Sequence, residues 1–379
     1  MGQRKIRLGI VGVGGVGAGR VKNAAETPEA EVTAVCDLNA KAVEDAQKLC
    51  PNAQAFSDAE KLFASGQCEA VLLNLPHFLH QPLGTAALQA GLHVLVEKPM
   101  AIRIGECDKM LAAAKKAGKL LTVHHQKRIT QRHVVNLMRN GELGPLVRAT
   151  YISNSVRNNK YYRTGAWRGT WKYEGGGVLI NQAIHDIDAL LNVTGQVAEV
   201  RARLDNLFHD HEVEDTCTAA LEYANGATGT FVANVSSFSP TNVVEYETER
   251  GAIQFGKPIK LGRLDGGVYD FYDAGDEAEM FAKKPGLTWQ DFPEAEPFEP
   301  GSLVRDFVLA VRDGRKPLVD PEGAREAVHF FNALVLSHFL QKPMRLPLDP
   351  AQVDEVFDAL AAGKWKLARR FKAPASVGA

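Results

Sequence analysis

Three polar residues of a predicted helix, Val178–Leu191, have the types and spacing expected of a reaction site. Asn181, His185 and Asp188 stand at positions i, i+4 and i+7, so their side chains project from one face of the helix, among apolar neighbours. A histidine can accept or donate a proton near neutral pH. A polar stripe of this kind either faces a reacting ligand or forms a buried hydrogen-bonded network, and the spacing alone favours neither interpretation.

A second candidate site is the glycine-rich segment Gly12-Val13-Gly14-Gly15-Val16-Gly17. It follows a predicted strand and precedes a helix, and Asp37 ends the next strand. Gly12 permits a tight turn, Gly14 lets a pyrophosphate approach the main chain, and Gly17 lets the helix pack closely on the strand. The helix N-terminus offers N–H donors and the positive end of its dipole to the phosphates. This order of elements predicts a dinucleotide-binding site.

Asp37 also bears on which dinucleotide binds. A carboxylate at the adenosine ribose repels a 2′-phosphate and accepts a hydrogen bond from a 2′-hydroxyl group. No arginine directly follows it in Cys36-Asp37-Leu38-Asn39. NAD is therefore the expected cofactor, and NADP is the less favoured alternative because the nearby Lys41 could accommodate a phosphate.

The first 123 residues supply the elements that would position these side chains. They alternate short apolar runs with longer helical patterns, which is typical of βαβ units that build a parallel sheet. Most of the runs lack polar alternation, as expected of strands with helices on both faces of the sheet. The predicted strands are Ile6–Val11, Glu31–Cys36, Ala70–Leu75, His93–Val96 and Leu120–Val123.

From residue 124 onward the pattern changes to longer alternating strands, which predicts an antiparallel or mixed sheet. We therefore expect a nucleotide-binding domain at 1–123 and a substrate-binding and oligomerisation domain at 124–379. Besides the helix described first, the predicted helices are Gln131–Asn140, Leu303–Arg312 and Glu322–Phe339. The predicted strands are Leu146–Val156, Glu199–Leu207, Cys217–Tyr223, Thr228–Ser236 and Val243–Phe255.

The composition argues for a small-molecule partner. The chain has 379 residues, of which 45% are hydrophobic, and 44 Lys and Arg balance 45 Asp and Glu, for a net charge of −1. No bulk positive charge attracts nucleic acid or an anionic membrane. No apolar stretch approaches the roughly 18 to 20 residues that a membrane-spanning helix needs. We expect neither a nucleic-acid nor a membrane partner.

Cysteine and histidine usage argues against disulfides and metals. The five cysteines are odd in number and form no C-x-x-C pair, which favours a reducing compartment. The first residues leave no room for a signal peptide, so a cytoplasmic location is expected. His209-Asp210-His211 superficially resembles a set of metal ligands, but it lacks thiolates or a distant H-x-x-x-H partner. We predict no metal site.

Three segments together resemble the Gfo/Idh/MocA family, the glucose-fructose oxidoreductase and inositol dehydrogenase superfamily. They are the glycine segment, the run Ala90-Gly91-Leu92-His93-Val94-Leu95-Val96-Glu97-Lys98-Pro99, and the run from Gly175-Gly176-Gly177 to Asp188. The resemblance covers nearly the whole chain, including Trp167-Arg168-Gly169-Thr170-Trp171. It implies an α/β fold, with an N-terminal Rossmann domain and a C-terminal α/β domain whose open mixed, mostly antiparallel sheet often forms subunit contacts. A homodimer or homotetramer is expected.

The resemblance implies NAD(P)-dependent oxidation of a secondary alcohol on a sugar, glycoside or cyclitol. The hydroxyl group must lose its proton while a hydride leaves the carbon, so a general base must contact that oxygen. The resemblance places Lys98 and His185 there as catalytic residues, and either could be the formal base. Lys98 follows a buried strand and precedes Pro99, and we expect a cis bond between them.

Other contacts are also implied by the resemblance. Arg128 corresponds to a substrate-contacting arginine, with a solvated charge as the alternative, and Asn181 and Asp188 would bind substrate as well. Inositol dehydrogenases carry Asp where this chain has Asn181, which argues against inositol as the substrate. The cofactor contacts outside the glycine segment and Asp37 would be Leu75, Pro76, His80, Glu97 and Lys98. Asn74-Leu75-Pro76-His77 replaces the family's frequent Thr-Pro-Asn, so polar contacts there would be rearranged.

Two other functions fit the same sequence. Retained NAD could oxidise a ring carbon transiently and so assist glycoside cleavage, or the chain could be a dinucleotide-dependent sensor without catalysis. The presence of both Lys98 and His185 argues against a sensor. The aromatic residues near the second motif could stack on a sugar or pack in the core; they are Tyr161, Tyr162, Trp167 and Trp171.

Overall fold

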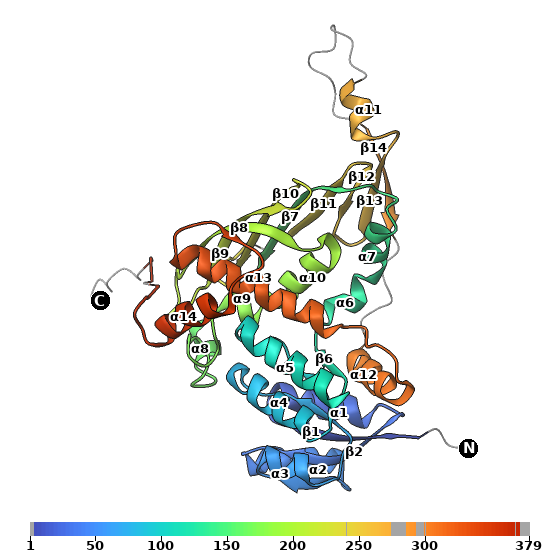
Figure 1. Cartoon of the computed structure of the whole chain (residues 1–379), viewed down its shortest axis with the longest axis vertical. Helices are drawn as coiled ribbons and strands as arrows, with labels where there is room; N and C mark the ends of the chain where they lie inside the picture. The colour runs from blue at the N-terminus through green and yellow to red at the C-terminus, as the bar shows by residue number, and fades with distance from the viewer. Residues whose placement is uncertain are drawn as a thin grey trace, which may run out of the picture.

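The computed structural model describes residues 4–239, 241–273, 286–292, 299, 301–367 and 369–371. Within these ranges the chain builds two β-sheets, a six-stranded sheet from its first third and a nine-stranded sheet from the remainder (Figure 1). Over the same ranges, no helix combines the length and the apolar character needed to cross a membrane.

The first sheet is parallel throughout, with the strand order β3-β2-β1-β4-β5-β6. Because the order changes direction between β1 and β4, this is the point at which doubly wound sheets bind ligands. Its strands are β1 (Ile6–Val11), β2 (Ala30–Cys36), β3 (Gln54–Phe56), β4 (Ala70–Leu73), β5 (His93–Val96) and β6 (Leu121–Val123). Its helices are α1 (Val16–Ala25), α2 (Ala40–Leu49), α3 (Ala59–Ala64), η1 (His77–Leu79), α4 (His80–Gln89) and α5 (Ile104–Ala117).

The five strands predicted in this part are confirmed, and β1 and β5 have the predicted bounds. β3 was not predicted because it has three residues, two of them exposed, and so carries no apolar pattern. The parallel sheet and its covering helices confirm the predicted fold of the first domain.

The second sheet has the order β14-β13-β12-β11-β7-β10-β9-β8-β15. β7 and β10 pair in parallel, and the other neighbours pair antiparallel, which confirms the open mixed, mostly antiparallel sheet. Its strands are β7 (Leu146–Asn154), β8 (Val197–Asp205), β9 (Thr216–Tyr223), β10 (Thr228–Asn234), β11 (Val243–Thr248), β12 (Gly251–Gln254), β13 (Ile259–Leu264), β14 (Leu287–Phe292) and β15 (Met344–Arg345).

One strand prediction in this sheet was wrong. The segment Val243–Phe255 is not a single strand but the hairpin of β11 and β12, in which Thr248 pairs with Gly251. Glutamates stand at alternate positions from Glu245 to Glu249. The alternating pattern of a strand therefore continues into the turn, and the turn could not be recognised from it. A Cβ atom on Gly251 would lie 2.3 Å from the main-chain oxygen of Gly262, so the close approach of β12 to β13 requires glycine.

Helices cover one face of the second sheet (Figure 1). The long helix α13 (Pro321–Phe339) contacts β8 and α10 (Ile184–Thr194), and residues along β9 alternate between exposed and buried. Large side chains such as Tyr151, Phe231 and Phe330 are buried between sheet and helices, and each such burial stabilises the fold by roughly 1.5–3 kcal/mol. The remaining helices are α6 (Lys127–Thr130), α7 (Arg132–Arg139), α8 (Asn159–Tyr162), α9 (Val178–Asn181), α11 (Val268–Asp273), α12 (Ser302–Asp313) and α14 (Pro350–Ala361).

The helix predicted at Val178–Leu191 is interrupted, so that prediction was wrong in part. The N–H group of Ala183 donates to the oxygen of Val178 at 2.7 Å, five residues back, and this wider turn separates α9 from α10. Asn181 therefore ends one short helix, while His185 is the second residue of the next. The three residues of the stripe do not share one continuous helical face.

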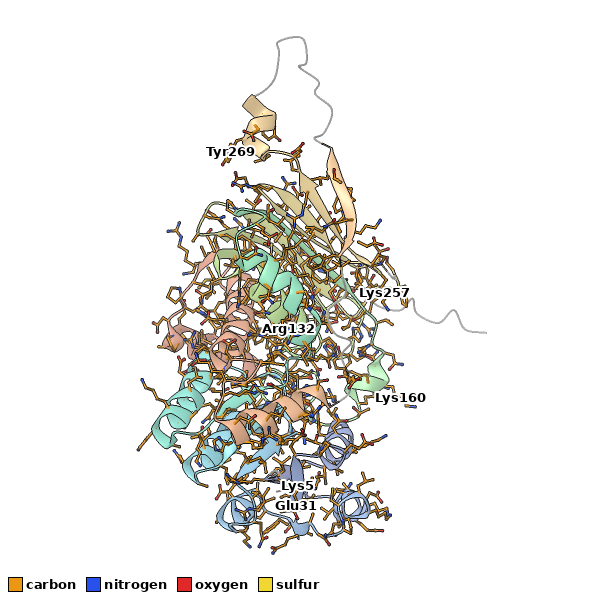
Figure 2. All side chains as sticks on the ribbon, turned by 90° about the vertical axis from the view of Figure 1, so that its right-hand side faces the viewer. Lys5, Glu31, Arg132, Lys160, Lys257 and Tyr269 are labelled. Carbon is orange, nitrogen blue, oxygen red and sulfur yellow. The ribbon has the colours of Figure 1, made fainter. Side chains whose placement is uncertain are left out.

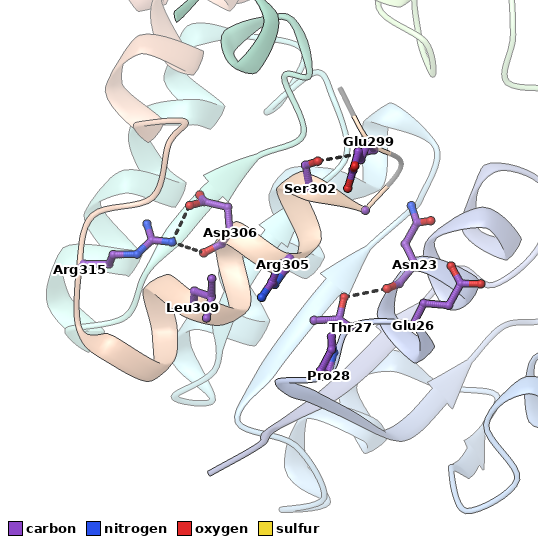
Figure 3. Close-up of a pocket in the computed structure, with 11 residues that line it drawn as sticks. Asn23, Glu26, Thr27, Pro28, Glu299, Ser302, Arg305, Asp306, Leu309 and Arg315 are labelled. Atoms are coloured by element: carbon purple, nitrogen blue, oxygen red, sulfur yellow. Dashed lines mark hydrogen bonds and ion pairs between the residues drawn. The ribbon is translucent and has the colours of Figure 1, made fainter. Parts of the chain in front are cut away.

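α12 returns to the first sheet, where Val304, Phe307 and Val308 pack in one core with β1 and β2. A cavity of about 380 Å³ lies between α1 and α12, and its lining contains none of the predicted site residues (Figure 3). The domain boundary at residue 123 stays a prediction. The packing of α12 means that a later part of the chain completes one layer of the first sheet.

Asn332 on α13 joins the two parts of the molecule through main-chain groups. Its Oδ1 accepts a hydrogen bond from the N–H of Ile104 at 2.9 Å, and its Nδ2 donates to the oxygen of Ile102 at 3.0 Å. The side chain is completely buried. Asn332 therefore provides hydrogen-bond partners for two buried main-chain groups at the start of α5.

We predict that Asn332→Ala lowers the free energy of unfolding by roughly 2–5 kcal/mol, because both main-chain groups lose their partner in a buried place. Urea unfolding followed by circular dichroism measures the change. Asn52→Ala, at an exposed asparagine, is the matched control and should change stability by less than about 0.5 kcal/mol. Equal stability of the two variants would contradict this account of the domain junction.

Candidate active site

The glycine segment lies between β1 and α1 in the conformation that a dinucleotide site needs. A Cβ on Gly12 would lie 2.1 Å from the main-chain oxygen of Asn74, and one on Gly17 would lie 1.9 Å from that of Gly12. These two glycines are required by the packing of the protein itself. In contrast, a Cβ on Gly14 would meet only ordinary contacts at 3.6 Å or more, and one on Gly15 would meet no atom within 4 Å.

The open space at Gly14 and Gly15 tests whether a dinucleotide fits. The protein's own packing does not demand the absence of a side chain at Gly14, whereas a pyrophosphate lying against the main chain would. α1 begins directly after this turn and has no side-chain cap on its first N–H groups. These donors can bind phosphate oxygens. The residues of the segment therefore fit a dinucleotide.

Asp37 lies at the end of β2 against the glycine segment. Its Oδ2 accepts hydrogen bonds from the N–H groups of Val13 at 2.9 Å and Gly14 at 3.2 Å, and its Oδ1 accepts one from Asn39. This places the carboxylate beside the turn, and the role of Asp37 as a ribose ligand stays a prediction. Lys41 forms ion pairs with two acidic residues of the exposed face of α2.

His80 holds the loop after β4 in place. The buried imidazole of His80 contacts the main-chain oxygens of Leu75 at 2.8 Å and Pro99 at 2.6 Å. His80 thus clamps Leu75 and Pro76 to the turn that follows Lys98. Because both ring nitrogens of His80 already contact main-chain oxygens, the role of His80 is to hold the loop. Leu75 and Pro76 are partly exposed. Asn74, at the departure from the family pattern, donates to the oxygen of Gly12 at 3.0 Å.

Lys98 follows β5 and reaches across to α9. Its Nζ donates to the main-chain oxygen of Asn181 at 2.6 Å and lies 3.4 Å from Asn181 Oδ1, and the Lys98–Pro99 bond is cis. Burial lowers the pKa of Lys98 to about 8, because the ammonium group loses hydration. The preceding Glu97 is buried and pairs with Arg20 at 2.6 Å, and it accepts a hydrogen bond from the main-chain N–H of Lys98 at 3.3 Å.

His185 is the second residue of α10 and lies close to Lys98. Burial lowers its pKa well below the ordinary value, and the charge of Lys98 adds to this shift, so the imidazole is neutral at neutral pH. Its Nδ1 is buried and has no hydrogen-bond partner in the described part of the chain. The ring packs edge-on against His125, with centroids 5.7 Å apart.

Arg128 and Asp188, which the resemblance implies as substrate contacts, bind each other in the structure. The guanidinium of Arg128 binds the carboxylate of Asp188 with distances of 2.7–3.1 Å, and its NH1 pairs with Asp320 at 2.5 Å. Both side chains are almost completely buried, so the alternative of a solvated arginine was wrong. The pair joins α6, α10 and the start of α13 behind His125, whose Nδ1 lies 3.9 Å from Asp188.

The sequence interpretation missed a carboxylate in this site, that of Glu174. It is completely buried, accepts hydrogen bonds from the amide of Asn181 and the N–H of Gly169, and lies 3.6 Å from Arg168 NH1. Burial raises its pKa. A signal was available, since Glu174 is the single acidic residue between Glu142 and Asp186 and directly precedes the glycine triplet.

The sequence matches two models of one family. Residues 6–125 match an oxidoreductase family with an NAD-binding Rossmann fold, and residues 131–254 match the Gfo/Idh/MocA C-terminal domain. The chain belongs to the Gfo/Idh/MocA family. It is thus an NAD-binding oxidoreductase of this family, and the predicted resemblance is confirmed.

Several Gfo/Idh/MocA relatives are dehydrogenases of cyclic compounds. The 1-carboxy-3-chloro-3,4-dihydroxycyclohexa-1,5-diene dehydrogenase of Comamonas testosteroni is 28% identical over 66% of this chain and 63% of its own length, so the match spans less than two thirds of that relative. An inositol 2-dehydrogenase of Corynebacterium glutamicum is 25% identical over 74% of this chain and 82% of its own length. Among solved structures, the WlbA dehydrogenase of Bordetella pertussis, in complex with NADH and UDP-GlcNAcA, superposes with a TM-score of 0.76 at 28% identity, covering 91% of this chain and 100% of that one.

The glycine segment generates a test of dinucleotide binding that does not depend on catalysis. We predict that Gly14→Ala leaves the thermal unfolding midpoint unchanged but weakens NADH binding by about 10-fold or more, because the added methyl group occupies the place of the pyrophosphate. Gly19→Ala on α1, where a Cβ would meet no atom within 4 Å, is the matched control. Calorimetric titration with NADH measures both. Equal affinities in the two variants would contradict the position of the pyrophosphate.

Proposed function

We propose that the chain is an NAD-dependent dehydrogenase that oxidises a secondary alcohol of a sugar, glycoside or cyclitol. The observation that carries the proposal is the position of Lys98, whose amine is held at Asn181 with a pKa near 8. The relatives named above support the substrate class, since they include an inositol dehydrogenase and a dehydrogenase bound to a nucleotide sugar acid.

The pKa values support Lys98 as the group that accepts the hydroxyl proton. An effective general base has a pKa close to the working pH, and that of Lys98 is about 8. The pKa of His185 lies well below the neutral range, so its imidazole binds a proton weakly. In this proposal neutral Lys98 takes the proton, while His185 serves the same oxygen as a hydrogen-bond partner.

The surrounding residues orient these two groups. Asn181 fixes the direction of the Lys98 amine through its main-chain oxygen, and Glu174 fixes the amide of Asn181. The amine of Lys98 and the imidazole of His185 can then bind the substrate hydroxyl in one orientation, which is the main requirement for a near-attack geometry. A bound nicotinamide supplies the acceptor for the hydride that leaves the substrate carbon.

The pH dependence follows from this assignment. We predict that kcat/KM rises about 10-fold per pH unit below pH 8 and levels off above it, because the amine of Lys98 must be neutral before it accepts a proton. Lys98→Met should lose about 10²- to 10⁴-fold in turnover together with this rise, and His185→Ala should lose turnover but keep the rise. NADH formation at 340 nm, over a panel of cyclitols, monosaccharides, uronic acids and aryl glycosides, measures each variant.

Lys109→Met, at an exposed lysine of α5, serves as the control and should behave like the native protein. A rise centred below pH 7 that disappears in His185→Ala would instead assign the base to His185. Release of an aglycone without net NADH would replace simple oxidation by redox-assisted cleavage. Unchanged turnover in both site variants would contradict the site itself.

We further propose NAD rather than NADP as the cofactor. The carboxylate of Asp37 beside the turn disfavours a 2′-phosphate, and the ion pairs of Lys41 with Glu44 and Asp45 compete with a phosphate for its charge. Asp37→Ala should weaken NAD binding by about 10-fold and NADP binding less, in calorimetric titrations. Glu31→Ala, at an exposed residue of the same strand (Figure 2), is the control. Equal losses for the two cofactors would count against Asp37 as the ribose ligand.

A further inference from the structure

A strongly basic segment leads into the active site. Between residues 157 and 173 the chain has five basic residues and no acidic one, although the whole protein has a net charge of −1. Four of the five are exposed, and Lys160 can be seen on the short helix α8 in Figure 2. The basic residues are Arg157, Lys160, Arg163, Arg168 and Lys172.

Arg168 differs from the other four because it is largely buried and contacts two aromatic rings. Its guanidinium carbon lies 4.4 Å from the ring centre of Trp167 and 4.6 Å from that of Tyr161, and its NH1 donates to Tyr161 Oη at 2.8 Å. Only 18% of the side chain is exposed. Stacking on aromatic rings holds the plane of a guanidinium, so its remaining N–H donors are ready to bind a ligand without further ordering.

Arg168 lies close to the reacting groups. Tyr161 Oη, which accepts from Arg168, is 3.4 Å from Asn181 Oδ1, and that oxygen is 3.4 Å from Lys98 Nζ. Only two polar groups therefore separate the guanidinium from the amine proposed as the base. A single small substrate can contact both Arg168 and Lys98.

The local charges do not balance. Glu174 is the acidic side chain that contacts Arg168 in the described part of the chain, at 3.6 Å, and its oxygens already accept hydrogen bonds from Asn181 and Gly169. The buried carboxylates of Glu174 and Glu97 thus face three cationic side chains, Arg168, Lys98 and Arg20, and Glu97 is already paired with Arg20 at 2.6 Å. Arg168 also helps to lower the pKa of Lys98, after the larger effect of burial. A negative charge brought by the substrate would compensate the excess positive charge.

We propose that the substrate carries an anionic group, a carboxylate or a phosphate attached to the sugar or cyclitol, and that Arg168 binds this group next to the hydroxyl that is oxidised. This inference rests on the proposed dehydrogenase function and narrows its substrate class. Charge-assisted hydrogen bonds from a preorganised guanidinium are among the strongest that a protein offers, and they select the anion over a neutral analogue.

Calorimetric titrations of the NADH-loaded protein test the proposal with three probes: D-glucuronate, D-glucose 1-phosphate and D-glucose. We expect one of the anionic probes to bind about 10-fold or more tightly than glucose, and Arg168→Gln to lose that preference while its weak affinity for glucose is kept. The first two probes distinguish a carboxylate from a phosphate. Arg168→Lys keeps the charge without the fork and should retain part of the preference, which also shows that the site still folds.

Arg163→Gln is the matched control, because Arg163 lies on the same segment but pairs with Asp210 at 3.5 Å. Glucose bound as tightly as both anions, an unchanged preference in Arg168→Gln, or an equal loss in Arg163→Gln would each overturn the proposal. NADH formation from neutral sugars alone would overturn it and leave the dehydrogenase function standing. Anion binding that depends on Arg168, without oxidation of any sugar, would uphold it and contradict the function.

Discussion

The amine of Lys98 is buried at the junction between the first sheet and the helices of the second, and the rest of the site depends on that constraint. An ammonium group taken out of water loses hydration, which lowers its pKa to about 8 and makes the neutral amine accessible near physiological pH. The hydrogen bond to the oxygen of Asn181 fixes where that amine points. Without burial, Lys98 would be an ordinary charged lysine and a poor base.

The elements around Lys98 explain how one side chain can be held so firmly. His80 ties the loop after β4 to Pro99, directly behind Lys98, and Asn332 ties the start of α5 to α13. On the other side, the buried pair of Arg128 and Asp188 fixes α10 behind His185. These contacts are made by rigid elements of both sheets, which is how a site keeps its geometry to a fraction of an ångström.

Much of this arrangement could be predicted from the sequence, because its signals are local. The glycine segment with Asp37 follows directly from a strand–turn–helix pattern, and the resemblance of the run that ends in Glu97-Lys98-Pro99 to a known family indicated Lys98. The break between α9 and α10 could not be predicted. The hydrogen bond from Ala183 to Val178 spans five residues instead of the four of an α-helix, and this change leaves the pattern of polar and apolar residues as it would be in a continuous helix. The sequence indicated that Arg128 and Asp188 lie near the site, but it could not show that the two side chains pair with each other.

The contacts that the sequence did not predict come from the segment before the glycine triplet, where Tyr161 was named only as an aromatic side chain that could stack on a sugar or pack in the core. Tyr161, Arg168 and Glu174 lie in loops and a one-turn helix, where no periodicity marks a face, and their meeting at Asn181 is a product of tertiary folding. The strands β13 and β14 were missed for a related reason, since residues along β14 are mostly exposed and give no apolar pattern.

An NMR titration of the lysine side chains in isotope-labelled protein tests the central claim most directly. The resonance of Lys98 is assigned as the one that disappears in Lys98→Arg. The account predicts that this resonance titrates near pH 8, because the amine is desolvated. A midpoint above about pH 10, the value of a lysine in water, would contradict it.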